Sequence, residues 1–120
     1  MIVAIDGPAG AGKSTIASKV SEKTGFFYLN TGNFYRALTY ALINEKIDIS
    51  DKDRIIKSAQ KHKIEIINNR VHLDGTDVEK YLRSDAVDAL VAQVSAITDV
   101  RYIINEQIQK ASKNHNIIAE

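Results

Sequence analysis

The chain has 120 residues, 44% of them apolar, a length that suits one compact domain and is too short for two of ordinary size. Sixteen basic and fifteen acidic residues leave a formal charge of +1, which argues against broad electrostatic binding to nucleic acid or to a membrane. Without cysteine, a membrane-span pattern or a signal-peptide pattern, the sequence predicts a soluble cytoplasmic protein that has no disulfides and no thiolate metal site.

The first fifty residues alternate between strand and helix patterns. Residues 2–5 and 26–29 are short apolar runs of strand length, and each is followed by a glycine-containing loop and a helical pattern. The second helical face carries Phe34, Leu38 and Leu42 at the spacing of helix turns. Alternation of this kind predicts a parallel sheet with its second strand beside the first, and ligands at the carboxyl ends of the strands.

The middle of the chain changes its pattern. Ser50 is a candidate helix cap, and residues 51–61 predict a short helix. Apolar runs at residues 64–67 and 71–73 flank Asn68-Asn69, a pair that is typical of a tight hairpin turn. A hairpin is antiparallel, so we expect an insertion beside the main sheet.

The last third is mostly helical. Apolar residues recur at helical spacing from Ser84 onward, and the capping residues Thr98 and Asp99 predict a break into two helices. Residues 116–119 are apolar enough to form a third parallel strand, which Glu120 follows.

The segment between the first strand and the first helix fits the phosphate-binding pattern G-x-x-x-x-G-K-[ST]. Its glycines allow several backbone N–H groups to point at phosphate oxygens, Lys13 adds a positive charge for the β and γ phosphates, and Ser14 is placed to ligate Mg²⁺. The sequence therefore predicts binding of a nucleoside triphosphate with Mg²⁺. The predicted loop consists of Gly7, Pro8, Ala9, Gly10, Ala11, Gly12, Lys13, Ser14 and Thr15.

Four strings together resemble the bacterial cytidylate kinases: "IDGPAGAGKST", "YLNTGNFYRAL", "DGTDVEKYLRSDAV" and "DVRYIINEQ". They cover essentially the whole chain in the family's order. The resemblance implies a three-layer α/β P-loop fold of the nucleoside monophosphate kinase type, with a parallel sheet, helices on both faces and a small hairpin and helical insertion. It also implies a core at residues 1–50 and 98–120, a monophosphate-binding insertion at 51–97, and transfer of a phosphoryl group from ATP to CMP or dCMP.

A kinase of this type needs a second phosphate pocket that faces the ATP site. Thr31 and Gly32 follow the second predicted strand, and Arg36 lies one helical turn later, where its planar fork can grip an acceptor phosphate. The resemblance adds Arg101 as another arginine that contacts this phosphate. We therefore expect Lys13, Arg36 and Arg101 to be catalytic, and Tyr35 to be a packing residue.

The resemblance and the residue spacing also predict roles for several other residues. Asp77 and Arg83 match recurring family positions, and we expect a polar pair that holds the insertion. At Ala92 the family usually carries a serine that helps to read the base, which leaves open whether CMP is preferred over UMP. The three histidines have no metal-ligand spacing and are expected at the surface: His62, His72 and His115.

Family members have roughly twice this length. We therefore expect the N-terminal part of a longer, monomeric enzyme, with little activity as 120 residues because the family's later arginines are missing. Glu120 falls where a carboxylate would hold Mg²⁺. Two other hypotheses remain: a P-loop kinase for UMP, AMP or a non-nucleotide alcohol, and a non-catalytic nucleotide-binding module.

Overall fold

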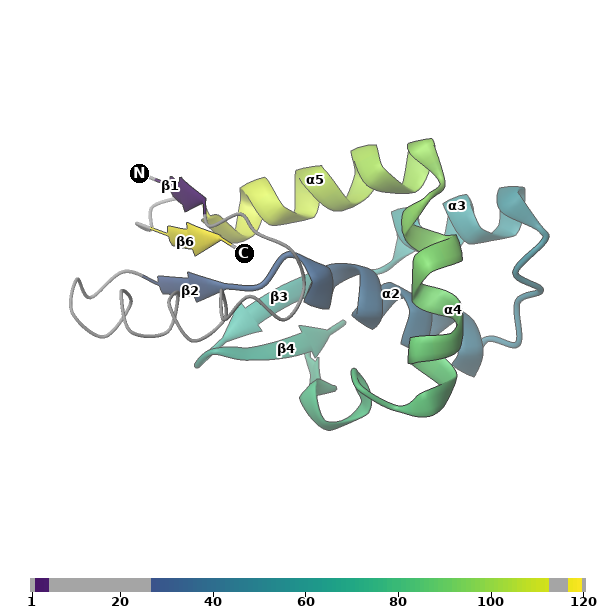
Figure 1. Ribbon diagram of the computed structural model, residues 1–120, viewed down its shortest axis with the longest axis horizontal. Helices are drawn as coiled ribbons and strands as arrows, with labels where there is room; N and C mark the ends of the chain where they lie inside the picture. The colour runs from purple at the N-terminus through teal and green to yellow at the C-terminus, as the bar shows by residue number, and fades with distance from the viewer. Residues whose placement is uncertain (1, 5–26, 113–116, 120) are drawn as a thin grey trace.

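The computed structural model describes residues 2–4, 27–112 and 117–119, and the side chains of residues 30–112. These residues form an α/β protein that has a parallel and an antiparallel sheet, with the helices packed beside them (Figure 1). None of the described helices is long and apolar enough to cross a lipid bilayer.

The parallel sheet contains β1 (Ile2–Ala4), β2 (Phe27–Leu29) and β6 (Ile117–Ala119) among the described residues. All three lie where the apolar runs predicted strands. The expectation that the second strand lies beside the first was wrong, because β6 lies between β1 and β2 (Figure 1). An apolar run marks a strand but does not name its neighbour, which depends on how the connecting segments pack.

Helix α2 (Gly32–Asn44) follows β2 closely and confirms the predicted helical face. Phe34, Leu38 and Leu42 are at most 2% exposed, so one stripe of the helix is fully buried. Glu45 caps the C-terminus of the helix, and Lys46 adopts a left-handed conformation with φ 55°. The N–H groups of Lys46 and Ile47 then donate to the carbonyl oxygens of Ile43 and Leu42 and close the last turn.

Helix α3 (Lys52–Lys61) is capped by Asp51, whose Oδ1 accepts a hydrogen bond from the Arg54 N–H at 3.2 Å. The expectation that Ser50 is the cap was wrong. Ser50 donates both its N–H and its hydroxyl to Asp48 Oδ1, at 2.9 and 2.7 Å, in a turn that precedes the helix. Ser50 and Asp51 could each cap the helix, but Ser50 is already hydrogen-bonded to the Asp48 carboxylate, so Asp51 is the cap.

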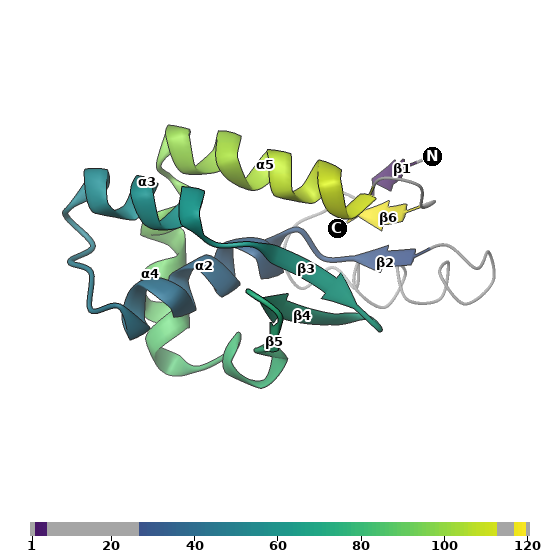
Figure 2. The same cartoon turned by 180° about the vertical axis from the view of Figure 1, so that it is seen from behind.

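The hairpin is confirmed as β3 (Ile64–Ile67) and β4 (Arg70–Leu73), and it lies beside α2 and below α5 (Figure 2). Asn68 and Asn69 have φ values of 53° and 62°, the left-handed pair of a two-residue turn. A third antiparallel strand, β5 (Thr76–Asp77), was not predicted because two residues carry no periodicity.

A short 3₁₀ helix, η1 (Glu79–Tyr81), leads to α4 (Asp85–Ser95) and then to α5 (Thr98–Ser112). Ser84 caps α4 by accepting a hydrogen bond from the Val87 N–H. The predicted break at Thr98 is confirmed. One buried cluster joins α2, α3, the hairpin, α4 and α5, and it includes Phe34, Ile55, Val71, Val94 and Ile104. The expected boundaries at residues 51 and 97 stay a prediction.

His62, the residue after α3, is not the surface residue that the sequence suggested. Its side chain is only 12% exposed and lies between two carboxylates. Nδ1 is 2.6 Å from Asp74 Oδ2, and Nε2 contacts Glu45 Oε1. Gln107 on α5 also donates to the His62 carbonyl oxygen at 3.0 Å. This junction joins the ends of α2 and α3 to the β4–β5 turn and to α5. His72 is partly exposed on β4, and His115 lies outside the described residues.

Candidate active site

The start of α2 forms the centre of the candidate site. Thr31 is the residue that precedes the helix, and its carbonyl oxygen accepts from the Phe34 N–H at 3.1 Å. Gly32 sits close to its neighbour: a Cβ at this position would lie 3.1 Å from Asn30 Oδ1, so a larger residue would have to move the Asn30 side chain. The N-terminus of α2 thus lies close to the carboxyl end of the parallel strand β2.

Arg36 lies one turn into α2, as predicted, and its side chain is 24% exposed. Its Nη1 donates to the Leu82 carbonyl oxygen at 2.9 Å and to Asp88 Oδ1 at 2.5 Å. Leu82 precedes α4 and Asp88 lies in its first turn, so Arg36 links α2 to α4. The sequence predicted an arginine that faces a ligand, and the structure adds the two protein groups that hold it.

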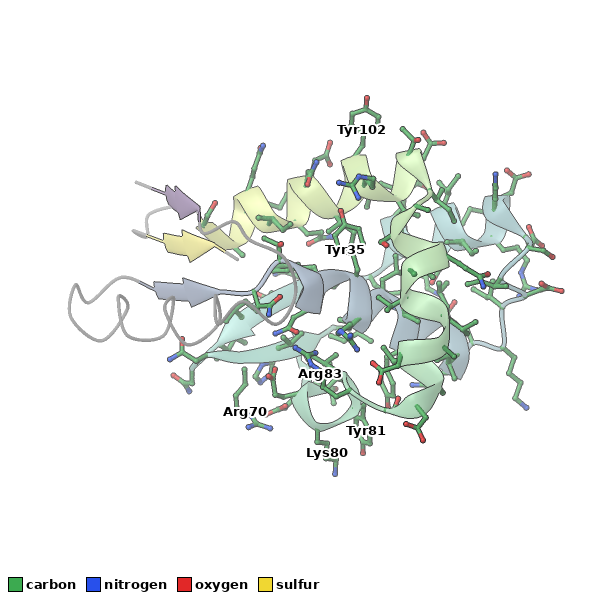
Figure 3. All side chains as sticks on the ribbon, viewed as in Figure 1. Tyr35, Arg70, Lys80, Tyr81, Arg83 and Tyr102 are labelled. Atoms are coloured by element: carbon green, nitrogen blue, oxygen red, sulfur yellow. The ribbon has the colours of Figure 1, made fainter. Side chains whose placement is uncertain are left out.

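A second arginine reaches the start of α2. Arg83 Nη2 donates to Asn33 Oδ1 at 2.8 Å, and Figure 3 shows Arg83 beneath the first turns of the helix. Asn33 and Arg36 are three residues apart on α2 and therefore share a face. Arg83 thus approaches the same side of the helix that presents Arg36.

The expected Asp77–Arg83 pair does not exist in the structure. Asp77 pairs instead with Arg70, whose Nε donates to Asp77 Oδ2 at 2.5 Å between β5 and β4. This hydrogen bond, with one from the Glu79 N–H, lowers the pKa of Asp77. Arg70 lies on β4, the strand that pairs with β5, so the pairing of these two strands brings Arg70 and Asp77 together. Asp77 keeps its expected structural role.

Arg101 is exposed on α5 and lies over the ring of Tyr35, with its guanidinium carbon 6.0 Å from the ring centroid. Its Nη1 donates to the Ser95 carbonyl oxygen at 3.3 Å. Tyr35 packs against the core, which confirms its packing role, and Figure 3 shows it between α2 and α5. The structure therefore places Arg101 against the residue that precedes Arg36.

Helix α4 carries Asp88, the acidic partner of Arg36. Asp88 is exposed apart from its contact with Arg36, and Ala92 is exposed one turn later on the same face. The family position at Ala92 thus lies next to the Asp88 turn. Sequence reasoning missed Asp88 and Asn33, because no local pattern identifies the partner of a residue about fifty positions away.

The three parallel strands end level with one another. Ala4 and Leu29 both pair with Ala119, so the carboxyl ends of β1, β2 and β6 reach the same edge of the sheet. The predicted phosphate loop, Gly7 to Thr15, and the predicted Mg²⁺ ligand Glu120 lie outside the described residues. Among the described residues, no group of three His, Cys, Asp or Glu side chains is arranged to hold a metal ion.

A separate cleft of about 620 Å³ lies between the end of α3, β3 and α5. Its lining includes Lys61, Lys63, Lys110 and Gln107, and does not include Arg36 or Arg101. This cleft is therefore distinct from the candidate site at the start of α2.

Comparison with known proteins shows the family of this chain. The sequence model of the family described as cytidylate kinase matches residues 3–120. The chain belongs to the cytidylate kinase family. It is 41% identical over 118 residues to a cytidylate kinase from Caldanaerobacter subterraneus, which covers 98% of this chain and 53% of the relative. It is 38% identical over 118 residues to the cytidylate kinase of Alkaliphilus oremlandii, with coverage of 98% and 54%.

A third relative is a larger protein with two functions in its name. The bifunctional pantoate ligase/cytidylate kinase of Nostoc is 40% identical over 126 residues, covering 99% of this chain and 24% of that protein. The chain thus spans about half the length of the curated single-function relatives it matches.

Proposed function

We propose that this protein transfers the γ-phosphoryl group of ATP to CMP or dCMP, forming CDP or dCDP and ADP. The observation that carries the proposal is the position of Arg36 in a chain of the cytidylate kinase family. It lies one turn into the helix that follows a parallel strand, at the carboxyl edge of the sheet, and its side chain is 24% exposed. A planar fork at this place suits an acceptor phosphate.

The proposal assigns the donor and acceptor to different loops of the same sheet edge. ATP would be bound by the predicted loop that follows β1, which contains Lys13 and Ser14. The acceptor would be bound by Thr31, Gly32, Arg36 and Arg101. The level carboxyl ends of β1, β2 and β6 support this arrangement, because loops that leave one edge can hold two phosphates face to face.

Each group has a chemical role in the proposed reaction. Lys13 would neutralise charge on the γ phosphate, while Arg36 and Arg101 hold the acceptor phosphate so that its oxygen lies in line for attack. The proposed Mg²⁺, on Ser14 and Glu120, would supply charge neutralisation for the β and γ phosphates. Because the transition state spreads negative charge over the transferring group, positively charged side chains that are already in place lower its energy.

The finer fold and setting are part of the same proposal. We propose a three-layer nucleoside monophosphate kinase fold with helices on both faces of the parallel sheet, divided at residues 50 and 97 as the resemblance implies. We further propose a cytoplasmic monomer that has small-molecule partners only.

A coupled ADP-release assay on the full-length protein tests the proposed reaction. CMP and dCMP should support turnover, and UMP and AMP should be poorer acceptors. Faster turnover with UMP, AMP or an alcohol would identify a different kinase. Binding of ATP and CMP without any turnover would instead indicate a nucleotide-binding module.

The donor half has its own test. Replacing Lys13 by alanine should reduce turnover by about a hundredfold or more, because a charge that acts on the transferring phosphoryl group is lost. Circular dichroism should report an unchanged fold. Turnover equal to that of the parent protein would refute the assignment of the phosphate loop.

A further inference from the structure

The guanidinium of Arg36 already has an anionic partner within the protein. Nη1 donates one hydrogen to Asp88 Oδ1 and the other to the Leu82 carbonyl oxygen, so both hydrogens of this nitrogen are used. Within residues 30–112, all hydrogen bonds of the Arg36 side chain leave from Nη1. The Nε–Nη2 edge of the same fork is the edge on which a phosphate can form a bidentate contact.

The ion pair is accessible from solvent. The Arg36 side chain is 24% exposed and that of Asp88 is 51% exposed. Asp88 lies in the first turn of α4, and its backbone N–H is bonded to Ser84, so the helix fixes its position beside Arg36. A ligand that reaches Arg36 therefore meets the Asp88 carboxylate at the same time.

The charges of the two anions oppose each other. A phosphate monoester carries between one and two negative charges at neutral pH, and Arg36 carries a single positive charge that Asp88 already balances. A phosphate on the second edge of the fork would lie within a few ångströms of the carboxylate. This separation is well inside the screening length of about 8 Å at physiological ionic strength, so their repulsion is not removed by salt.

We propose that Asp88 competes through its charge with the acceptor phosphate for Arg36, and that residue 88 thereby sets how weakly this protein holds its acceptor. The inference rests on the proposed function. The diphosphate product keeps the phosphate that faced Arg36, so the same repulsion favours product release.

Replacing Asp88 by asparagine isolates this charge. The asparagine Oδ1 can accept the same hydrogen bond from Nη1, and the Leu82 carbonyl oxygen still holds Arg36 in place. The side chain keeps its size, so only the negative charge is lost. A purely structural role for the ion pair predicts weaker binding in this variant, whereas competition predicts tighter binding.

The experiment is isothermal titration of the full-length protein with CMP and, separately, with ATP. Asp88→Asn should lower the Kd for CMP by about two- to tenfold, the range expected for one partly exposed charge, and leave the Kd for ATP unchanged. Asp88→Glu, which keeps the charge, should bind CMP within about twofold of the parent protein.

Asp85→Asn is the matched control, because it removes the same charge from the same helix without a bond to Arg36. Its Kd for CMP should change less than that of Asp88→Asn. Unchanged or weaker CMP binding by Asp88→Asn would overturn the inference and leave the proposed function standing. Absence of CMP binding by the parent protein would overturn both, so the two failures are distinguishable.

Discussion

At the scale of single residues, Arg36 depends on the shape of its side chain as well as on its charge. Nη1 donates to the Leu82 carbonyl oxygen and to Asp88, which leaves the Nε–Nη2 edge for a bidentate contact with a phosphate. A lysine ammonium has too few N–H donors to make all these contacts together. Arg36→Lys should therefore raise the KM for CMP by about ten- to hundredfold, the loss expected for hydrogen bonds between charged groups. Steady-state kinetics of the full-length protein with varied CMP provide the measurement.

The KM for ATP should stay within about twofold in the same variant, because Arg36 belongs to the acceptor side of the proposed site. Arg54→Lys is the matched control, because it makes the same substitution at an exposed arginine on α3. An equal rise in the KM for ATP and CMP would show that the substitution damages the whole fold and not the acceptor site.

At the scale of the elements, the end of α2 contains a correctable strain. Lys46 has φ 55°, a left-handed conformation that costs a residue with a Cβ about 1 kcal/mol and costs glycine almost nothing. Lys46→Gly should therefore raise the free energy of unfolding by about 0.5 to 1 kcal/mol in a urea titration. Asn44→Gly, at the last residue of the helix, should not raise it, because Asn44 has no positive φ for glycine to relieve.

The start of α3 distinguishes two neighbouring polar residues. Asp51 accepts from the Arg54 N–H, and Ser50 is bonded to Asp48 in the preceding turn. Asp51→Ala should lower the free energy of unfolding by about 1 kcal/mol through loss of the cap, and Ser50→Ala should lower it by less. The reverse order in urea titrations would mean that Ser50 is the effective cap.

The same elements show what the sequence can reveal. Apolar patterns located β1, β2, β6 and helices α2, α4 and α5, and Asn68-Asn69 revealed the hairpin, because these signals are local. The helix predicted after the phosphate loop lies outside the described residues. Strand order, the two-residue strand β5 and the Asp77 partner were missed or mispredicted, since each depends on contacts between distant segments. Arg36 was predicted from its place after a strand and from the family resemblance, but Asp88 is 52 residues away and only the fold brings it to Arg36.

At the scale of the whole molecule, the junction around His62 fastens four elements together and depends on charge. Both ring nitrogens of His62 face carboxylates, and both can donate only when the ring is protonated. Burial raises the pKa of Glu45, but hydrogen bonds from His62, Lys61 and Ser58 outweigh it, and the pKa is lowered. The pKa of Asp74 is also lowered, because the Lys63 N–H and His62 outweigh the effect of burial.

These shifts predict a loss of stability in acid. A carboxyl group with a lower pKa in the folded state than in the unfolded state contributes stability above its unfolded pKa and loses it as the pH falls through the folded value. The free energy of unfolding should therefore decrease below about pH 4.5. Asp48 and Asp77 also have lowered pKa values, so the contribution of the junction is measured as a difference between variants.

Asp74→Asn should lower the free energy of unfolding by on the order of 1 kcal/mol at pH 7, the upper range for a half-exposed ion pair. Below about pH 4.5, the free energy of unfolding of the variant should fall less steeply than that of the parent protein. Asp53→Asn, an exposed carboxylate in the first turn of α3, is the control that changes the net charge equally. Urea titrations at several pH values measure both differences. If the free energies of unfolding of Asp74→Asn and the parent protein run parallel with pH, Asp74 does not couple folding to protonation. If they converge in acid, the carboxylates around His62 form a pH-dependent link between the hairpin and the helices.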